Sequence, residues 1–233
     1  MSQPSLDPQF DAFAADYDAA LNKGLSVSGE HKSYFAQGRI RHTAQRLASM
    51  GIDVKRAMDF GGGTGSAVPF LYESFGGLRY LLGTDVSDKS LAVARRVHGH
   101  CAQFSLMSDY QPDGSFDLVY CNGVFHHIPL AERPKCLRYV FDSLRPGGVF
   151  ALWENNPWNP GTRLVMSRIP FDKDAVPLSP PQTRRLMRDA GFEVMATDYL
   201  FVFPRLLRWL RPIENLTVKL PAGAQYVVIG RRP

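Results

Sequence analysis

The spacing of apolar positions changes after Gly51, and the change separates two regions of the chain. In the first region apolar residues recur at helical spacing, which predicts helices over about 8–21 and 31–50. In the second region short apolar runs alternate with amphipathic stretches, as they do where strands and helices alternate around a parallel sheet. We therefore expect an N-terminal helical cap over 1–51 and an α/β domain over 52–233.

The apolar runs of the second region have the length of buried strands. Strands are expected at about 56–60, 79–85, 100–105, 116–121, 147–154, 192–202 and 225–230. Helices are expected at about 64–75, 88–97, 130–144 and 180–190. A stretch rich in Asn and Pro, 155–163, predicts a loop. A basic amphipathic helical stretch within about 203–220 is expected as an insertion between the last two strands.

A glycine turn follows the first predicted strand, in the order Asp59-Phe60-Gly61-Gly62-Gly63-Thr64-Gly65. Glycines let the backbone approach a ligand closely, and the turn delivers that ligand to the N-terminus of the next helix. The spacing G-x-G-x-G departs from the dinucleotide fingerprint G-x-G-x-x-G, because Ser66 stands at the third glycine position. Asp59 suits a ligand with a cationic group. Asp85, at the end of the second predicted strand, can accept the ribose hydroxyls of a nucleoside.

Together these residues resemble the cofactor site of the class I S-adenosylmethionine (SAM)-dependent methyltransferases. The resemblance covers about residues 10–155 and continues through Leu81-Leu82-Gly83-Thr84-Asp85-Val86-Ser87, Pro112-Asp113-Gly114-Ser115-Phe116-Asp117-Leu118-Val119 and Leu144-Arg145-Pro146-Gly147-Gly148. It implies SAM as the cofactor and a doubly wound α/β fold. In that fold seven strands form a mostly parallel sheet of order 3-2-1-4-5-7-6, with an antiparallel last strand.

The resemblance also implies which residues bind the cofactor. They are Tyr17, Asp59, Gly61, Gly62, Gly63, Thr64, Gly65, Asp85, Val86, Ser105, Leu106, Asn122 and Gly123. In the family the tyrosine matching Tyr17 often lies over the cofactor, although core packing explains it equally well. Ser105 occupies the position where an acidic residue often reads the adenine amino group, and Asp109 is the alternative.

Two adjacent histidines, His126 and His127, follow the fourth predicted strand, at the edge where open sheets bind ligands. Either could take the proton that an acceptor hydroxyl, amine or activated carbon loses around methyl transfer. Alternatively, both are structural, because histidines before a helix can satisfy its N–H groups or pack. The strand ends in Cys121-Asn122-Gly123-Val124, without the Asp/Asn-Pro-Pro-Tyr/Phe motif common in methyltransferases of DNA bases or protein amides. A small-molecule acceptor is therefore expected.

Positive charge is concentrated in the last third of the chain. Residues 161–233 hold 12 Lys and Arg against 6 Asp and Glu, whereas the whole chain has a net charge of +5. Either a solvated basic face or an anionic partner would explain the excess. The basic third keeps RNA methylation open as an alternative function, although nucleic acid is not the expected partner. A non-catalytic SAM-binding or scaffold protein is the other alternative.

The predicted insertion combines apolar residues with regularly spaced arginines. They are Phe203, Leu206, Leu207, Trp209 and Leu210, with Arg205, Arg208 and Arg211. This composition fits a lid over an acceptor pocket, an interfacial helix resting weakly on anionic lipid, or core packing with arginines reaching to water. Pro204 and Pro212 limit the helix to about two turns, which favours the lid. An acceptor under it would be at least partly apolar or aromatic. The segment Asn155-Asn156-Pro157-Trp158-Asn159-Pro160 resembles a subgroup of uncharacterised bacterial methyltransferases, and this resemblance implies a lipid- or glycan-related acceptor as a further candidate.

The remaining composition indicates a cytoplasmic protein. The three cysteines, Cys101, Cys121 and Cys136, lack metal or redox spacing and are expected as reduced thiols. No cluster of metal ligands is recognisable, so no metal is expected. The polar, acidic N-terminus is unlike a signal peptide, and no apolar run approaches the ~20 residues of a membrane span. The oligomeric state stays open.

Overall fold

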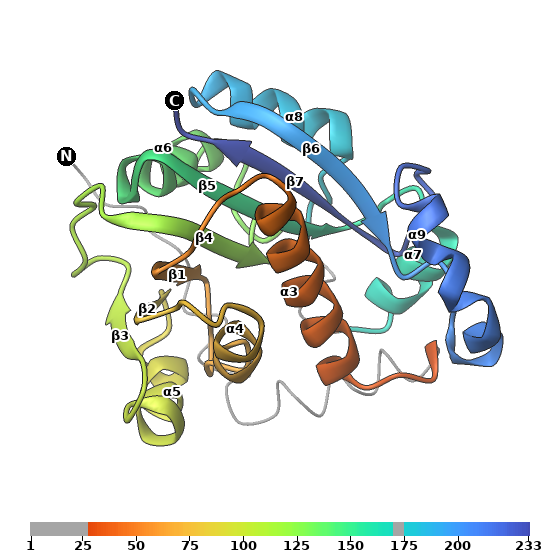
Figure 1. Cartoon of the computed structure of the whole chain (residues 1–233), viewed down its shortest axis with the longest axis horizontal. Helices are drawn as coiled ribbons and strands as arrows, with labels where there is room; N and C mark the ends of the chain where they lie inside the picture. The colour runs from red at the N-terminus through yellow and green to blue at the C-terminus, as the bar shows by residue number, and fades with distance from the viewer. Residues whose placement is uncertain (1–27, 170–174) are drawn as a thin grey trace.

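The structure, a computed structural model, describes residues 28–169 and 175–233. The predicted helix over 8–21, with Tyr17, lies outside the described residues. A seven-stranded sheet forms the centre of the molecule (Figure 1). Its strands are β1 (Arg56–Phe60), β2 (Tyr80–Asp85), β3 (Gln103–Leu106), β4 (Phe116–Asn122), β5 (Leu144–Asn155), β6 (Glu193–Leu200) and β7 (Gln225–Arg231). Every predicted strand is confirmed, with its ends shifted by at most a few residues.

The strand order is β3-β2-β1-β4-β5-β7-β6. Each of the pairs β1–β2, β1–β4, β2–β3 and β4–β5 is parallel, whereas β7 runs antiparallel to both β5 and β6. This confirms the predicted doubly wound sheet and its antiparallel last strand. The direction of winding reverses between β1 and β4. Open α/β sheets bind ligands at the carboxyl ends of the strands beside such a reversal.

Helices cover both faces of the sheet. The helices of the described residues are α3 (Lys32–Ser49), α4 (Val68–Ser74), α5 (Asp88–His98), α6 (Arg133–Ser143), α7 (Pro160–Met166), α8 (Pro180–Asp189), the 3₁₀ helix η3 (Arg205–Ile213) and α9 (Glu214–Thr217), of which η3 and α9 lie at one end of the molecule (Figure 1). The helices predicted between 31 and 190 are confirmed. One of them, α4, begins later than predicted because the glycine turn continues to Ala67.

Two stretches differ from their prediction. The stretch 155–163 is not a loop throughout, because α7 begins at Pro160 and the side chain of Asn159 caps it by accepting the N–H of Thr162. The amphipathic stretch forms η3, a 3₁₀ helix with a kink at Leu207, instead of an α-helix. Pro212 lies inside η3 and removes a backbone donor that a regular helix would use.

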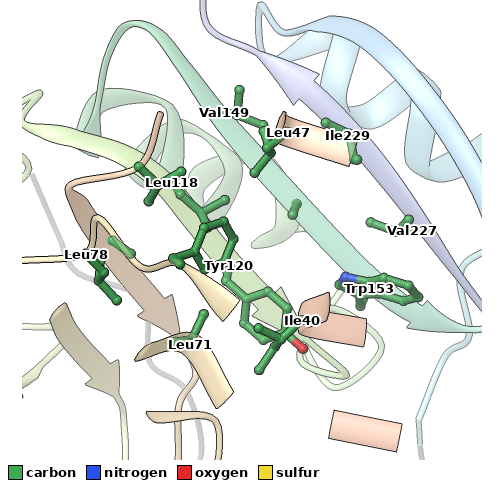
Figure 2. Close-up of a cluster of buried hydrophobic side chains, with 14 of the residues drawn as sticks. Ile40, Leu47, Leu71, Leu78, Leu118, Tyr120, Val149, Trp153, Val227 and Ile229 are labelled. Carbon is green, nitrogen blue, oxygen red and sulfur yellow. The ribbon is translucent and has the colours of Figure 1, made fainter. Parts of the chain in front are cut away.

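Alternate residues of the strands build a hydrophobic core on each face of the sheet. On one face Leu118, Tyr120 and Trp153 belong to the same buried cluster as Ile40 and Leu47 of α3 (Figure 2). The core on the other face is completed by α6 and α8. The helix α3 therefore shares a core with the sheet. The division into a cap over 1–51 and a domain over 52–233 stays a prediction.

Polar contacts also join α3 to the sheet. The indole N–H of Trp153 in β5 donates to the Thr43 hydroxyl at 3.0 Å. Asp198 of β6, which is fully buried, pairs with His42 of α3 and with Lys219. Burial alone would raise the pKa of Asp198, but hydrogen bonds from His42 and Lys219 hold it at about 2. These contacts fix α3 relative to the inner strand β5 and the edge strand β6.

Candidate functional site

The predicted site residues within the described chain lie along the carboxyl edge of the sheet. The glycine turn follows β1, Asp85 ends β2 and Val86 follows it, Ser105 and Leu106 end β3, Asn122 ends β4 and Gly123 follows it. The two histidines come shortly after Gly123 in the same connection. The strand register places Asp59 opposite Gly83 of β2 and Tyr120 of β4. Tyr17 is outside the described residues, so its role stays a prediction.

Backbone contacts shape the glycine turn. The N–H groups of Gly61 and Gly62 donate to the Thr84 carbonyl at 2.8 and 3.0 Å, which joins the turn to the end of β2. Gly63 has a φ of 54°, a conformation that favours glycine, and a Cβ there would point into open space. A Cβ on Gly62 would instead lie 2.7 Å from Oδ2 of Asp59. The absence of side chains thus leaves room beside Gly63 and brings the turn close to Asp59.

Asp59 is a carboxylic acid buried beside this turn, only 4% exposed. Burial raises the pKa of Asp59 to about 7, the Asp85 carboxylate adds to the rise, and the Arg39 guanidinium opposes it. No hydrogen bond from the described residues offsets the rise. Ionised Asp59 is therefore poorly stabilised by the protein alone, and a cation beside it would relieve that cost.

Asp85 hydrogen-bonds both to the glycine turn after β1 and to the turn after β2, at the carboxyl edge of the sheet. Its carboxylate accepts the backbone N–H of Gly63 at 2.8 Å and that of Ser87 at 2.9 Å. In the sheet Asp85 lies opposite Leu106 of β3. Ser105, beside Leu106, is half-buried, whereas the alternative adenine reader Asp109 is exposed and accepts a hydrogen bond from Ser108.

The two histidines differ in their surroundings. Nδ1 of His126 lies 2.6 Å from Oε2 of Glu154 at the end of β5, and both side chains are buried. The other carboxylate oxygen of Glu154 accepts the N–H of Phe125 at 2.9 Å, so both oxygens are held. With Glu154 ionised, Nδ1 of His126 carries a proton and Nε2 is the nitrogen that can accept another. His127 is half-buried, and its ring centroid lies 4.1 Å from that of His126.

Sequence reasoning missed Glu154, although its signal was present. Like Asp59 and Asp85, it is an acidic residue that follows a buried apolar run, here 149–153 at the end of a central strand. All three acids lie near the carboxyl ends of their strands, β1, β2 and β5.

Sequence reasoning also missed Arg39, a charged residue on the buried face of α3. Its Nε donates to the Tyr120 hydroxyl at 3.3 Å, and its Nη1 donates to Oε1 of Gln225 at 2.9 Å. The amide of Gln225 in turn donates to Asn155 at 3.1 Å. Because Arg39 also acts on the pKa of Asp59, a line of polar groups runs from Asp59 through Arg39 to the ends of β5 and β7.

A cavity of about 270 Å³ lies at the far end of this polar line, where Asn155 and Gln225 form part of its wall. The start of α3, the end of β5, α7 and the segment between β6 and η3 surround it, and Figure 1 shows these elements gathered at one end of the sheet. Most of the wall is apolar, including Phe35, Val165 and Phe203.

Two charged side chains, Glu30 and Arg211, complete the wall among the described residues. They form an ion pair of 2.8 Å. The Arg211 guanidinium also lies 4.5 Å from the centroid of the Tyr34 ring and donates to the Phe203 carbonyl. The single cation among the described wall residues is therefore already matched by an acid. Phe201, another wall residue, has a φ of 63°, a strained conformation for a bulky side chain.

Fold and site together define a doubly wound α/β protein whose glycine turn is flanked by two acids. Comparisons with known proteins narrow this class. The family described as "Methyltransferase domain" matches residues 58–150. A crystal structure of a SAM-dependent methyltransferase from Mesorhizobium loti has the same fold, with a TM-score of 0.58 at 22% identity over 81% of this chain and 96% of that one.

Two curated relatives are trans-aconitate 2-methyltransferases. That of Rhizobium etli is 25% identical over 191 residues, which cover 75% of this chain and 73% of the relative. That of Rhizobium rhizogenes is 29% identical over 120 residues, which cover 51% of this chain and 46% of the relative. The second alignment thus spans less than half the length of that relative. Residues 58–150 thus match a methyltransferase-domain family, and together with these relatives and the shared fold this supports a class I SAM-dependent methyltransferase, an enzyme whose cofactor is S-adenosylmethionine.

The residues present fit that cofactor. SAM is cationic at its sulfur and its amino group, and the buried Asp59 lacks a hydrogen-bonded partner among the described residues. Beside it, the open space at Gly63 lets a ligand reach the backbone. The described residues contain no group of three His, Cys, Asp or Glu side chains placed to hold a metal. All three cysteines are free thiols, as expected. Over the same ranges, no helix has the length and apolar character to cross a membrane.

Proposed function

We propose that this protein transfers the methyl group of SAM to a small-molecule acceptor. The observation that carries the proposal is the Asp59 carboxylic acid, buried beside the glycine turn with its pKa raised to about 7. A site that keeps such a group without a hydrogen-bond donor is suited to a ligand that brings its own positive charge. SAM does so, and the methyltransferases that this chain resembles use it.

The residues at the carboxyl edge of the sheet would then have distinct roles. When bound, SAM supplies a methyl group activated by its positively charged sulfur. Asp59 would neutralise the cationic portion of the cofactor, and Asp85 would accept hydrogen bonds from the ribose hydroxyls. The open space beside Gly63 would let the cofactor contact the backbone. His126, oriented by Glu154, would take the acceptor's proton at Nε2. Glu154 acts here as a positioning residue.

The cavity supports an acceptor that is small and largely apolar or aromatic. Its volume of about 270 Å³ suits a compact molecule, and its wall offers aromatic and aliphatic side chains with a few amides. Glu30 and Arg211 neutralise each other there, so the described wall has no spare cation for a multiply charged anion. The acceptor in the relatives' names, trans-aconitate, is a carboxylate anion, and we expect it to be a poor acceptor here.

The test uses SAM with an isotopically labelled methyl group and a bacterial metabolite extract, followed by mass spectrometry. We expect label in a small apolar or aromatic product, and little label in added trans-aconitate. Rapid labelling of trans-aconitate would show that the acceptor class is wrong. Label appearing only in added RNA would favour the nucleic-acid alternative. SAM binding without any transfer would favour the non-catalytic alternative.

A further inference from the structure

The segment from Arg205 to Thr217, which forms η3 and α9, contains no buried residue. Large apolar side chains are nevertheless frequent in it and just beyond it. Those exposed to solvent are Leu206, Leu207, Trp209, Ile213, Leu216 and Leu220, and Leu206, Trp209 and Leu216 are exposed by 88%, 71% and 83%. We call these six residues, with Arg205 and Arg208, the η3–α9 surface. The core-packing interpretation of this stretch is wrong for these residues.

The lid interpretation applies only to the two ends of η3. Phe203 and Pro204 before it and Arg211 near its end line the cavity, whereas Leu206 and Trp209 do not. Figure 1 shows η3 and α9 projecting at one end of the molecule, beside α7. The η3–α9 surface thus lies next to the cavity wall without forming part of it.

The charges of this segment are predominantly positive toward solvent. Arg205 and Arg208 are exposed, and Arg205 donates only to the Gly29 carbonyl among the described groups. Arg208 has no acidic partner in the described part of the chain. The acidic residue of α9, Glu214, is half-buried and bonded to the Val202 N–H. Exposed leucines and a tryptophan are therefore interspersed with cations that lack acids.

We propose that the η3–α9 surface docks on an anionic lipid bilayer. Apolar side chains at the end of a projecting segment can enter the headgroup region, tryptophan is favoured at that depth, and arginines attract anionic headgroups. A second copy of this chain is a poorer occupant, because a two-fold contact would bring Arg205 and Arg208 against the same unpaired cations. Docking would place the cavity beside the membrane, where apolar molecules concentrate.

The test is co-sedimentation of the full chain with vesicles of phosphatidylcholine alone or mixed equally with phosphatidylglycerol. We expect binding to the anionic vesicles that weakens at high salt and is at least tenfold weaker on pure phosphatidylcholine. A Leu206→Ser/Trp209→Ser variant should lose this binding at least tenfold, and Arg205→Gln/Arg208→Gln should reduce it severalfold. The matched control, Val97→Ser/Leu130→Ser, removes two exposed apolar side chains elsewhere and should bind like the parent protein.

Because the replaced residues are exposed, all variants should melt like the parent protein. The proposal is overturned if anionic vesicles are not bound, if lipid charge makes no difference, or if the control loses as much binding as the test variant. A dimer in solution that Leu206→Ser/Trp209→Ser dissociates would assign the surface to a second copy instead. Light scattering after size-exclusion chromatography measures that outcome. None of these results depends on which acceptor is methylated.

Discussion

Nδ1 of His126 and Oε2 of Glu154 lie 2.6 Å apart in the interior, although 28 residues separate them in the sequence. The pairing fixes which ring nitrogen of His126 carries a proton when Glu154 is ionised. It is the reason why we propose His126 rather than His127 as the base, a choice that the sequence alone left open.

The first prediction concerns this pair. His126→Asn should lower the rate of methyl transfer by about 10²–10⁴, because the acceptor loses its base. Glu154→Gln should lower the rate in the same direction, since the histidine loses its orienting carboxylate. SAM affinity, measured by calorimetry, should change little in both variants. His127→Asn is the matched control and should keep most of the rate. If His126→Asn turns over normally, the pair is structural.

The second prediction concerns Asp59 and cofactor affinity. With a pKa of about 7, Asp59 is mostly protonated at pH 6 and mostly ionised at pH 7.5. SAM should therefore bind more tightly as pH rises across this range, by on the order of tenfold, while its amino group stays largely protonated. Asp59→Asn should weaken binding at pH 7.5 and abolish most of the pH dependence. Calorimetry at both pH values measures this, and an unchanged slope in the variant would contradict it.

The third prediction concerns Asp59 and the stability of the ligand-free protein. Its pKa is raised in the folded state, so the folded protein holds the proton more tightly than the unfolded chain does. The corresponding stability is present below about pH 4 and is lost as pH rises toward about 7. Asp59→Asn should therefore raise the free energy of unfolding at pH 8, by a few kcal/mol at most, and have little effect at pH 4. Urea denaturation at the two pH values checks this sign.

The fourth prediction concerns the glycine turn. Gly63→Val should abolish SAM binding, because the side chain would fill the open space beside the backbone. Gly51→Val is the matched control, since Gly51 also has a positive φ, 71°, and open space around its Cβ, but lies at the end of α3. Asp85→Ala should weaken SAM binding by about 1–3 kcal/mol by leaving ribose hydroxyls unpaired. Near-native affinity in both site variants would overturn the cofactor assignment.

The fifth prediction concerns the cavity. Val165→Trp should fill it and exclude N-phenyl-1-naphthylamine, a neutral aromatic probe whose fluorescence rises in apolar surroundings. Leu164→Trp is the control on the same helix, because Leu164 is 45% exposed and does not line the cavity. The control and the parent protein should bind the probe, and excess trans-aconitate should not displace it. SAM affinity should stay constant in both variants, which separates a failed cavity assignment from a failed cofactor assignment.

The strands and most helices were predictable because their signals are local. An apolar run such as that of β1, followed by glycines, indicates a strand and a turn without knowledge of the rest of the chain. The position of β7 between β5 and β6 was not visible in this way, since local spacing does not encode which strands pair, and it came from the family resemblance. The prediction of a regular amphipathic helix at η3 was wrong, because the apolar pattern does not distinguish a 3₁₀ helix from an α-helix.

The residues of the site likewise fall into two groups, those that local sequence signals predict and those that only the folded structure brings together. Asp59 and Asp85 each follow an apolar run directly and were predicted from it. The cavity was not predictable, because its charged pair joins Glu30 to Arg211 across 181 residues. The bond from Arg39 to Gln225 likewise joins residues 186 positions apart. Such contacts depend on the packing of α3 against the far end of the sheet, which no short window of the sequence contains.

The position of β7 in the sheet determines when the sheet can be completed during synthesis on the ribosome. Among the described strands, β6 pairs with β7 alone and β5 meets β6 only through β7, yet β7 is the last of these seven strands to be synthesised. Until residues 225–231 emerge, the β7-facing edge of β5 is uncovered and β6 has no neighbour among these strands. Such edges are where nascent chains pair with one another and aggregate. Completion of this sheet by its final strand therefore ends the interval in which the new chain is most exposed to misassembly.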